Sequence, residues 1–370
     1  MTRVAWFSTD WQFEDVKGGK PGRKVAYYGG TYHYRMGLPC DELGKNGWDT
    51  MMSWAVRPAP DGHIQVLDHM GETWHDDCDV IVFQRWMRAD AADMTRRARA
   101  CGQTIIQDVD DLFWALPKSN IAHEMTDPTK NVDFNRDHYH RMIGASDALI
   151  VSTDEIARWL APLKVPTFIC RNGVRLSDWP VLDAGVGMVG WVGGVAWRAH
   201  DLQALKPVLP QFLEDWGIPF YHGGHDPERR PWAWEQLGIN TDRTRVYTAP
   251  LVALSHYPSL WGPLGLALVP LEDTPFNRAK SWLKGLEAAA SGLPFIASDM
   301  PEYRRLGFGR LAKNSKPSSW RYHLDQLADP EVRRIEGADN RMRAQEHDMA
   351  HRWKQWDEAL RAIIPAKVPA

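Results

Sequence analysis

The chain has 370 residues, more than one ordinary hydrophobic core accommodates, and this length predicts two domains. Its 44% hydrophobic and 25% charged residues are typical of globular proteins, and no apolar run approaches the roughly 20 residues that a membrane-spanning helix needs. The formal net charge of −3 argues against a general attraction to nucleic acid. The cysteines form no C-x-x-C pair, which argues against a zinc knuckle or a disulfide framework and favours reduced, mostly buried thiols.

The first half of the chain alternates short apolar runs with helical patterns. The predicted strands are 4–7, 79–83, 104–106, 148–151 and 166–170, and the predicted helices include 34–46 and 89–101. Ser152–Glu155 has the pattern of a helix N-cap. This rhythm indicates a parallel sheet covered by helices, so we predict a Rossmann-like domain over residues 1–171.

The second half repeats the rhythm after a turn-rich linker that we place at residues 172–187. Strands are predicted at 188–192, 218–221, 245–247, 265–270 and 293–298, with a helix at 201–214. These elements predict a second Rossmann-like domain over 188–337. Apolar residues at helical spacing in 339–364 predict that the tail, 338–370, packs on the body of the protein.

A predicted helix over 277–291 carries an unusual stripe of charge. Lys280, Lys284 and Glu287 stand at i, i+4 and i+7 and therefore share one face, while Asn277 has the character of an N-cap. A lysine beside a helix N-terminus is locally unfavourable unless an anion binds there. The pattern predicts an anion site, although a solvated charged face is the alternative.

The stretch from Leu271 to Asp299 resembles the donor-binding motif of GT-B glycosyltransferases of the retaining family 4, or group 1, type. The resemblance implies that Glu287 holds the donor ribose. A second family glutamate is replaced here by Ala279, and Asn277, Lys280 and Ser281 are its expected substitutes. The pattern N-x-x-K-S-x-x-K-x-x-E therefore resembles a variant branch of that family.

Further resemblances extend over most of the chain and imply an α/β fold of the GT-B class, in which two Rossmann-like domains face a central cleft and a C-terminal helix packs back on the body. Asn172–Val174 resembles the interdomain segment of the family, and Gly29 to Arg35 resembles its glycine-rich loop. A structural turn is the alternative for the glycine loop. The donor-binding residues that this resemblance implies are Gly29, Gly30, Arg35, Gly193, Gly194, Arg198, Asn277, Lys280, Ser281, Lys284 and Glu287, with His200 in place of a common lysine.

The acidic segment Gln107–Trp114 follows the strand 104–106, at the carboxyl end where open α/β sheets bind ligands. It resembles the D-x-D-D signature of the variant branch. Asp110 and Asp111 are expected to meet sugar hydroxyl groups or to act in base chemistry, and His123 is a further catalytic candidate. Because GT-B enzymes generally neutralise the leaving diphosphate with basic residues and a helix dipole, we expect no metal and no cofactor.

The predicted reaction is transfer of a sugar from a nucleoside-diphosphate sugar to an acceptor hydroxyl, with the retention of configuration that the resemblance implies. A polysaccharide, a protein and a hydroxylated DNA base remain alternative acceptors. A nucleotide-sugar epimerase, a phosphorylase-like enzyme and a non-catalytic saccharide- or nucleotide-binding protein remain alternative functions. The N-terminus lacks the pattern of a signal peptide, so a cytoplasmic location is expected, and the oligomeric state is left open.

Tryptophans and histidines are predicted mainly as packing residues. The 19 tryptophans offer apolar area for a core, with sugar-stacking platforms as the alternative. The pairs His138–His140 and His222–His225 have no acidic or cysteine partner at ligand spacing, which favours core or surface roles over a zinc site.

Overall fold

The structure, a computed structural model, describes residues 2–15, 24–68, 71–195, 200–226, 228 and 230–364, with only the backbone of 11–15 and 24–28. The chain divides into two units. Unit 1 comprises the residues up to Trp114, Glu124–Asn172 and those from Met349 onward, and unit 2 comprises Ala115–His123 and Gly173–Asp348.

Unit 1 is built on a six-stranded parallel sheet; the sequence predicts a parallel sheet and five of these strands, but not the strand Asp49–Ser53. Its order is β11-β10-β9-β8-β1-β4. The strands are β1 (Arg3–Ser8), β4 (Asp49–Ser53), β8 (Val80–Gln84), β9 (Thr104–Val109), β10 (Ala148–Val151) and β11 (Thr167–Ile169). Two small antiparallel sheets were not predicted: β2 (Trp11–Asp15) with β3 (Lys24–Tyr28), and β5 (Ala55–Pro58) with β6 (Ile64–Leu67) and β7 (Trp74–His75).

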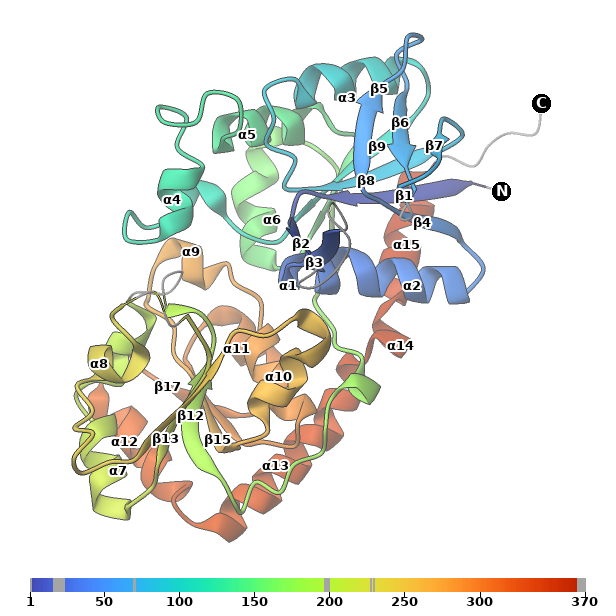
Figure 1. The fold of residues 1–370 in the computed structure, drawn as a ribbon. Helices are drawn as coiled ribbons and strands as arrows, with labels where there is room; N and C mark the ends of the chain where they lie inside the picture. The colour runs from blue at the N-terminus through green and yellow to red at the C-terminus, as the bar shows by residue number, and fades with distance from the viewer. Residues whose placement is uncertain are drawn as a thin grey trace. The chain divides into compact units, whose positions relative to one another are not determined.

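Helices cover this sheet, and Figure 1 shows α3 and α5 side by side over it. The helices are α1 (Gly30–Tyr32), a π-helical turn His33–Gly37, α2 (Leu38–Lys45), α3 (Ala91–Ala100), α4 (Ile121–Met125, within which the chain passes from one unit to the other), α5 (Arg136–Ala145), α6 (Asp154–Leu160), α14 (Met349–Arg352) and α15 (Lys354–Ile363). The predicted N-cap is confirmed, because Thr153 Oγ1 accepts a hydrogen bond from Ile156 N at 3.3 Å. The C-terminal helix α15 packs on unit 1, where Trp48 Nε1 donates to Asp357 Oδ1 at 2.7 Å.

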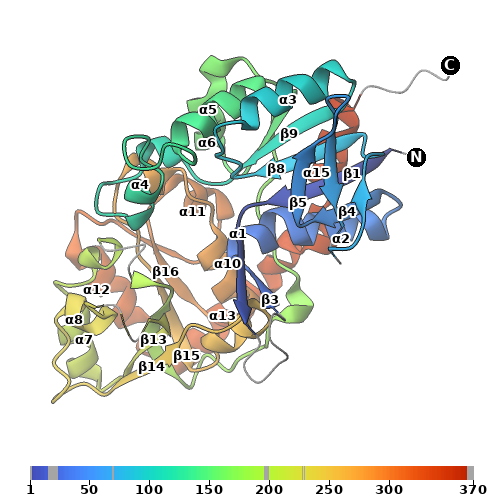
Figure 2. The same ribbon diagram turned by 45° about the horizontal axis from the view of Figure 1, so that its top comes forward.

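Unit 2 contains the second parallel sheet, in the order β14-β13-β12-β15-β16-β17. Numbered along the chain, this is the 3-2-1-4-5-6 order of a Rossmann fold. The strands are β12 (Met188–Val192), β13 (Phe220–His225), β14 (Val246–Pro250), β15 (Leu264–Val269), β16 (Phe295–Ser298) and β17 (Arg310–Ala312). Figure 2 shows these strands with helices around them.

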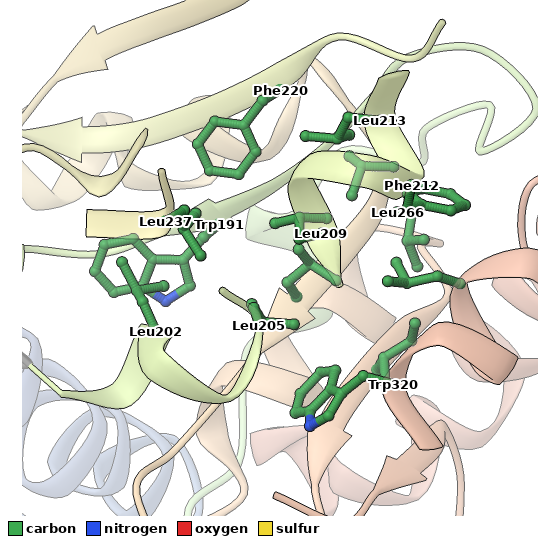
Figure 3. Packing of buried hydrophobic residues seen from close by; sticks show 14 of the residues in the cluster. Trp191, Leu202, Leu205, Leu209, Phe212, Leu213, Phe220, Leu237, Leu266 and Trp320 are labelled. Carbon is green, nitrogen blue, oxygen red and sulfur yellow. The ribbon is translucent and has the colours of Figure 1, made fainter. Parts of the chain in front are cut away.

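The helices of unit 2 are α7 (Leu209–Trp216), α8 (Ala233–Leu237), α9 (Pro275–Arg278), α10 (Leu283–Ala290), α11 (Pro301–Leu306), α12 (Pro317–Gln326) and α13 (Pro330–Ala344). The apolar faces of α7, α8 and α12 close a core against β12, β13 and β15, in which Trp191, Phe212 and Trp320 are buried (Figure 3). The prediction that tryptophans serve mainly as core residues is confirmed for these and for Trp6, Trp86, Trp261, Trp282 and Trp356.

Two of the helical segments that the sequence predicts are divided into shorter elements. The helix predicted over 201–214 becomes a 3-10 turn, Asp201–Ala204, followed by α7, because Pro207 lacks a backbone N–H and disfavours the helical conformation before it. The tail 339–364 is divided among the end of α13, α14 and α15. Among the described residues, no helix is long and apolar enough to cross a membrane.

The four cysteines are free, and Cys40, Cys78 and Cys170 are buried, as predicted. Burial raises the pKa of each of these three thiols to about 12, because the thiolate loses its hydration.

Candidate functional site

The strand order of unit 2 reverses between β12 and β15, and ligands of open α/β sheets bind outside the carboxyl ends of the strands at such a point. Gly193 and Gly194 follow β12 directly. Gly193 N donates to Gly223 O at 2.9 Å, and a Cβ at Gly193 would lie 3.1 Å from the Trp191 ring. The predicted glycines thus lie at the switch point, and a side chain at Gly193 would press on the Trp191 ring.

The loop after this strand contains Arg198, which lies outside the described residues, and an exposed His200. The next residue, Asp201, is buried and was not predicted. Its Oδ1 accepts hydrogen bonds from Asn277 Nδ2 at 2.8 Å and from Glu272 N at 2.9 Å. Asp201 therefore ties the segment after β12 to the segment after β15.

The predicted continuous helix over 277–291 is wrong. Thr274 is the N-cap of α9, since its Oγ1 accepts from Asn277 N at 3.1 Å, and α9 ends at Arg278. α10 begins five residues later at Leu283, and Figure 1 shows the two helices as separate. Asn277 is therefore not a cap: its amide is used to bind Asp201 and Glu272 O.

The break changes the position of the predicted anion site. Lys280 and Ser281 lie between the helices, and Lys280 Nζ lies 4.3 Å from the centre of the Phe276 ring. α10 starts without a side-chain cap, and its first turn contains no acidic residue. The positive end of a helix dipole is thus preceded by Lys280 and contains Lys284, a combination that suits an anion.

Glu287 is the most deeply buried charged group on α10, with 2% of its surface exposed. Its Oε2 accepts hydrogen bonds from Tyr257 OH at 2.9 Å and from Lys284 Nζ at 3.0 Å. Lys284 Nζ also donates to Tyr257 OH and lies 4.7 Å from the centre of that ring. Tyr257 was not predicted: it belongs to the 3-10 segment Leu254–Trp261, 30 residues away in the sequence.

In unit 1 the predicted glycine loop meets an acidic side chain. Asp10 follows β1, and its Oδ2 accepts from Tyr32 N at 3.3 Å in the first helical turn. A Cβ at Gly29 would lie 1.9 Å from that oxygen, whereas one at Gly30 would meet nothing within 4 Å. The close approach of Asp10 therefore explains Gly29, and Gly30 is sterically open.

Arg35 lies in the interior of unit 1, with 1% of its surface exposed. It donates to both oxygens of Asp108, from Nε at 3.1 Å and from Nη2 at 2.6 Å, and to Asn172 Oδ1 at 3.0 Å. Burial raises the pKa of Asp108 to about 6, although Arg35 acts in the opposite direction. This position favours a structural role for Arg35 over the predicted donor contact.

Asp110 and Asp111 converge on a residue that the sequence reasoning missed, Arg85. Its Nη2 lies 3.0 Å from Asp110 Oδ2 and 3.2 Å from Asp111 Oδ2, and its Nη1 lies 4.0 Å from Asp10 Oδ1. Burial raises the pKa of Asp110, and the charge of Arg85 opposes that rise. Arg85 and Asp10 both stand just after a strand. The same strand-end position led to the prediction of Asp110, so it could also have indicated Arg85 and Asp10.

The predicted catalytic His123 lies in α4, where its backbone N donates to Asn120 O at 2.9 Å, in a segment grouped with unit 2. Its role beside Asp110 stays a prediction. Within the part of the chain that the structure describes, no group of three or more His, Cys, Asp and Glu side chains is arranged to hold a metal ion.

No known protein family matches the sequence, and no curated protein matches it either. Several solved structures have a similar fold. TarM superposes with a TM-score of 0.54 at 11% identity over 82% of this chain and 62% of that chain, so this chain spans less than two thirds of TarM. The E. coli trehalose-6-phosphate structure bound with UDP-2-fluoro glucose gives 0.54 at 12%, over 78% and 74%. A glycosyltransferase from Rickettsia africae gives 0.55 at 10%, over 78% of each chain.

The fold is GT-B. The predicted pair of Rossmann-like domains is thereby confirmed, and the low identities make this a statement about fold. Within that GT-B fold, the structure brings Lys284 together with Glu287 in one unit and Asp110 with Asp111 in the other.

Proposed function

We propose that this protein is a glycosyltransferase that moves a sugar from a nucleoside-diphosphate sugar to an acceptor hydroxyl group. The observation that carries the proposal is the buried carboxylate of Glu287, held by Lys284 and Tyr257 in a domain of GT-B fold. A carboxylate with a fixed orientation can accept hydrogen bonds from the two hydroxyl groups of a ribose.

The donor diphosphate would lie at the start of α10. Breaking the bond between the sugar C1 and the diphosphate oxygen leaves additional negative charge on that oxygen. Lys280, Lys284 and the N-terminal dipole of α10 would stabilise this charge as it develops, and the flexible glycine backbone at Gly193 and Gly194 would allow close approach.

The acceptor oxygen forms the new bond to C1 and gives up its proton. Asp110 and Asp111 at the carboxyl edge of the unit 1 sheet would bind sugar hydroxyl groups or receive that proton. Retention of configuration, a cytoplasmic location and independence of metal belong to this proposal, and a polysaccharide, a protein or a hydroxylated DNA base would serve as the acceptor.

A thermal-shift panel of UDP-, GDP-, dTDP- and ADP-sugars tests the donor half, since a ligand that binds only the folded protein raises its melting temperature. The UDP-sugar is the first to examine, because a structural neighbour binds UDP-2-fluoro glucose. We expect one nucleotide series to raise the melting temperature of the wild type and of Glu331→Gln, an exposed control, but not of Glu287→Ala. A flat panel, or an equal rise in Glu287→Ala, would contradict the donor site.

A further inference from the structure

Arg85 has a backbone conformation that a residue with a side chain rarely adopts. Its φ is 54°, and among the described residues other than glycine only Lys164 shares a positive φ. Lys164 ends a 3-10 turn, where this conformation is common, but Arg85 stands at the end of a buried strand. Strain of this kind persists where the surroundings fix it, and it gathers at functional sites.

The neighbouring strand fixes this strained turn. Thr9 Oγ1, just after β1, donates to Arg85 O at 2.9 Å, and Ser8 Oγ donates to Gln84 Oε1 at 2.7 Å in the interior. The strand order of the unit 1 sheet reverses between β1 and β8, so this turn lies at the switch point of that sheet.

The turn directs the guanidinium to residues from several elements. Besides Asp110 and Asp111, Arg85 Nη2 donates to Thr31 Oγ1 at 2.8 Å, and the guanidinium carbon lies 5.4 Å from the centre of the Phe113 ring. Arg85 Nε donates to the other Asp110 oxygen at 3.3 Å, so the contact with Asp110 is bidentate. A bidentate contact fixes the plane of a carboxylate, which a lysine cannot do.

The surrounding charges leave the Asp110 carboxylate dependent on Arg85. Arg35, which also acts electrostatically on Asp110, is paired with Asp108 through two hydrogen bonds. The titratable groups that face Asp110 from the packed elements are Arg85, Asp111, Arg35, Asp108, Tyr139 and, across Arg85, Asp10. Three of these are carboxylates, so removal of Arg85 would leave Asp110 among like charges.

We propose that Arg85 is a positioning residue: it holds the carboxylates of Asp110 and Asp111 in the orientation in which they meet the hydroxyl groups of a sugar substrate. This inference rests on the proposed function, and it adds a residue that acts through Asp110 without reacting itself. The strained turn, the switch point and the bidentate contact support it independently.

The test compares Arg85→Lys and Arg85→Gln with a control, Arg88→Gln. The control removes an exposed arginine that is paired with Asp90 and stands three residues after Arg85. The first readout is the pKa of the Asp110 carboxyl, measured by carbon NMR in protein labelled at aspartate Cγ, with Asp110→Asn for assignment. We expect this pKa to rise in Arg85→Gln and to stay unchanged in Arg88→Gln. An unchanged pKa in folded Arg85→Gln would overturn the proposal.

The second readout is turnover of the nucleotide sugar selected by the thermal-shift panel. We expect kcat to fall by about 10²-fold in Arg85→Lys, with the donor KM kept, because the charge remains but the orientation is lost. The acidic limb of the pH profile should move to higher pH in Arg85→Gln. A kcat of Arg85→Lys equal to that of the wild type would overturn the positioning role. Because Arg85→Lys keeps the positive charge, it can still be measured if Arg85→Gln does not fold.

The two proposals fail in different ways. Absence of donor binding by the wild type would count against the glycosyltransferase assignment, whereas the NMR titration reports on Arg85 and Asp110 whatever the protein binds.

Discussion

Lys284 Nζ and Glu287 Oε2 lie 3.0 Å apart on successive turns of α10, and both also bond to Tyr257 OH. The lysine side chain is 18% exposed and the glutamate side chain 2%. A buried carboxylate that loses its cation is strongly unfavourable. Removal of Lys284 alone would therefore destabilise the fold.

We expect Lys284→Met to lower the free energy of unfolding by about 3 kcal/mol, because Glu287 remains buried without its cation. Tyr257→Phe removes the hydrogen bonds of the hydroxyl group to Glu287 and Lys284 and should cost about 1–2 kcal/mol. Urea unfolding measures both. Lys316→Met, at an exposed lysine, is the control and should stay within about 0.5 kcal/mol of the wild type. Equal stabilities of Lys284→Met and the control would contradict this account of the pair.

The Arg35–Asp108 pair predicts a second, pH-dependent effect. Arg35→Met should destabilise the protein by about 3–5 kcal/mol at pH 7, since Asp108 is then buried as an unpaired charge. Without Arg35 the pKa of Asp108 rises further, so Asp108 is protonated and no longer a buried charge at low pH. The loss in free energy of unfolding caused by Arg35→Met should therefore be smaller at pH 5 than at pH 7. Arg96→Met, which breaks an exposed pair with Asp93, should cost less than about 1 kcal/mol at either pH. A loss that does not depend on pH would argue against this assignment of charge.

His222 is buried in unit 2, where its Nε2 lies 2.9 Å from Gly193 O and its ring stacks on Trp191. Burial lowers its pKa to about 4. Between about pH 6.5 and pH 4 the unfolded chain therefore binds a proton at His222 that the folded protein does not bind. The contribution of neutral His222 to the free energy of unfolding is fully present above about pH 6.5 and is lost as the pH falls towards 4. Urea unfolding should show a loss of up to about 3 kcal/mol between pH 7 and pH 4 that His222→Gln reduces. The same pH dependence in both proteins would exclude His222 as its source.

The cysteines should differ in reactivity. Cys101 is partly exposed, whereas burial raises the pKa of the other three thiols to about 12. A thiol reagent at pH 7.5 should modify Cys101 first and reach Cys40, Cys78 and Cys170 only after unfolding. Mass spectrometry of digested protein identifies the modified residue. Rapid labelling of Cys170 in folded protein would contradict its burial beneath α15.

The strands could be predicted because parallel sheets covered on both faces require short, continuous apolar runs, and these are visible locally. The N-cap at Thr153 is equally local. The break between α9 and α10 was missed because Lys280, Lys284 and Glu287 keep helical spacing across it. In the structure the segment is held by the cap at Thr274 and by the bond from Asn277 to Asp201, and the latter joins residues 76 positions apart.

The site residues show the same limit. Glu287 and Asp110 were identified from motifs, but their partners Tyr257 and Arg85 stand 30 and 25 positions away in the sequence. Such contacts depend on sheet order, which sequence spacing does not reveal. The strand-end position of Arg85 was visible, whereas its left-handed backbone was not, because an arginine gives no local signal for a positive φ.

The central claim is transfer of a sugar from a nucleotide donor, and the release of nucleoside diphosphate measures it directly. Wild type, Glu287→Ala and Asp110→Ala would be incubated with each sugar nucleotide of the panel, with and without an acceptor mixture of oligosaccharides. We predict that the wild type releases diphosphate from one nucleotide series, faster with acceptor, and that both variants lose this activity while remaining folded. Two results would contradict the account. Both variants could release nucleoside diphosphate as fast as the wild type, or the wild type could bind a donor and release no diphosphate from it.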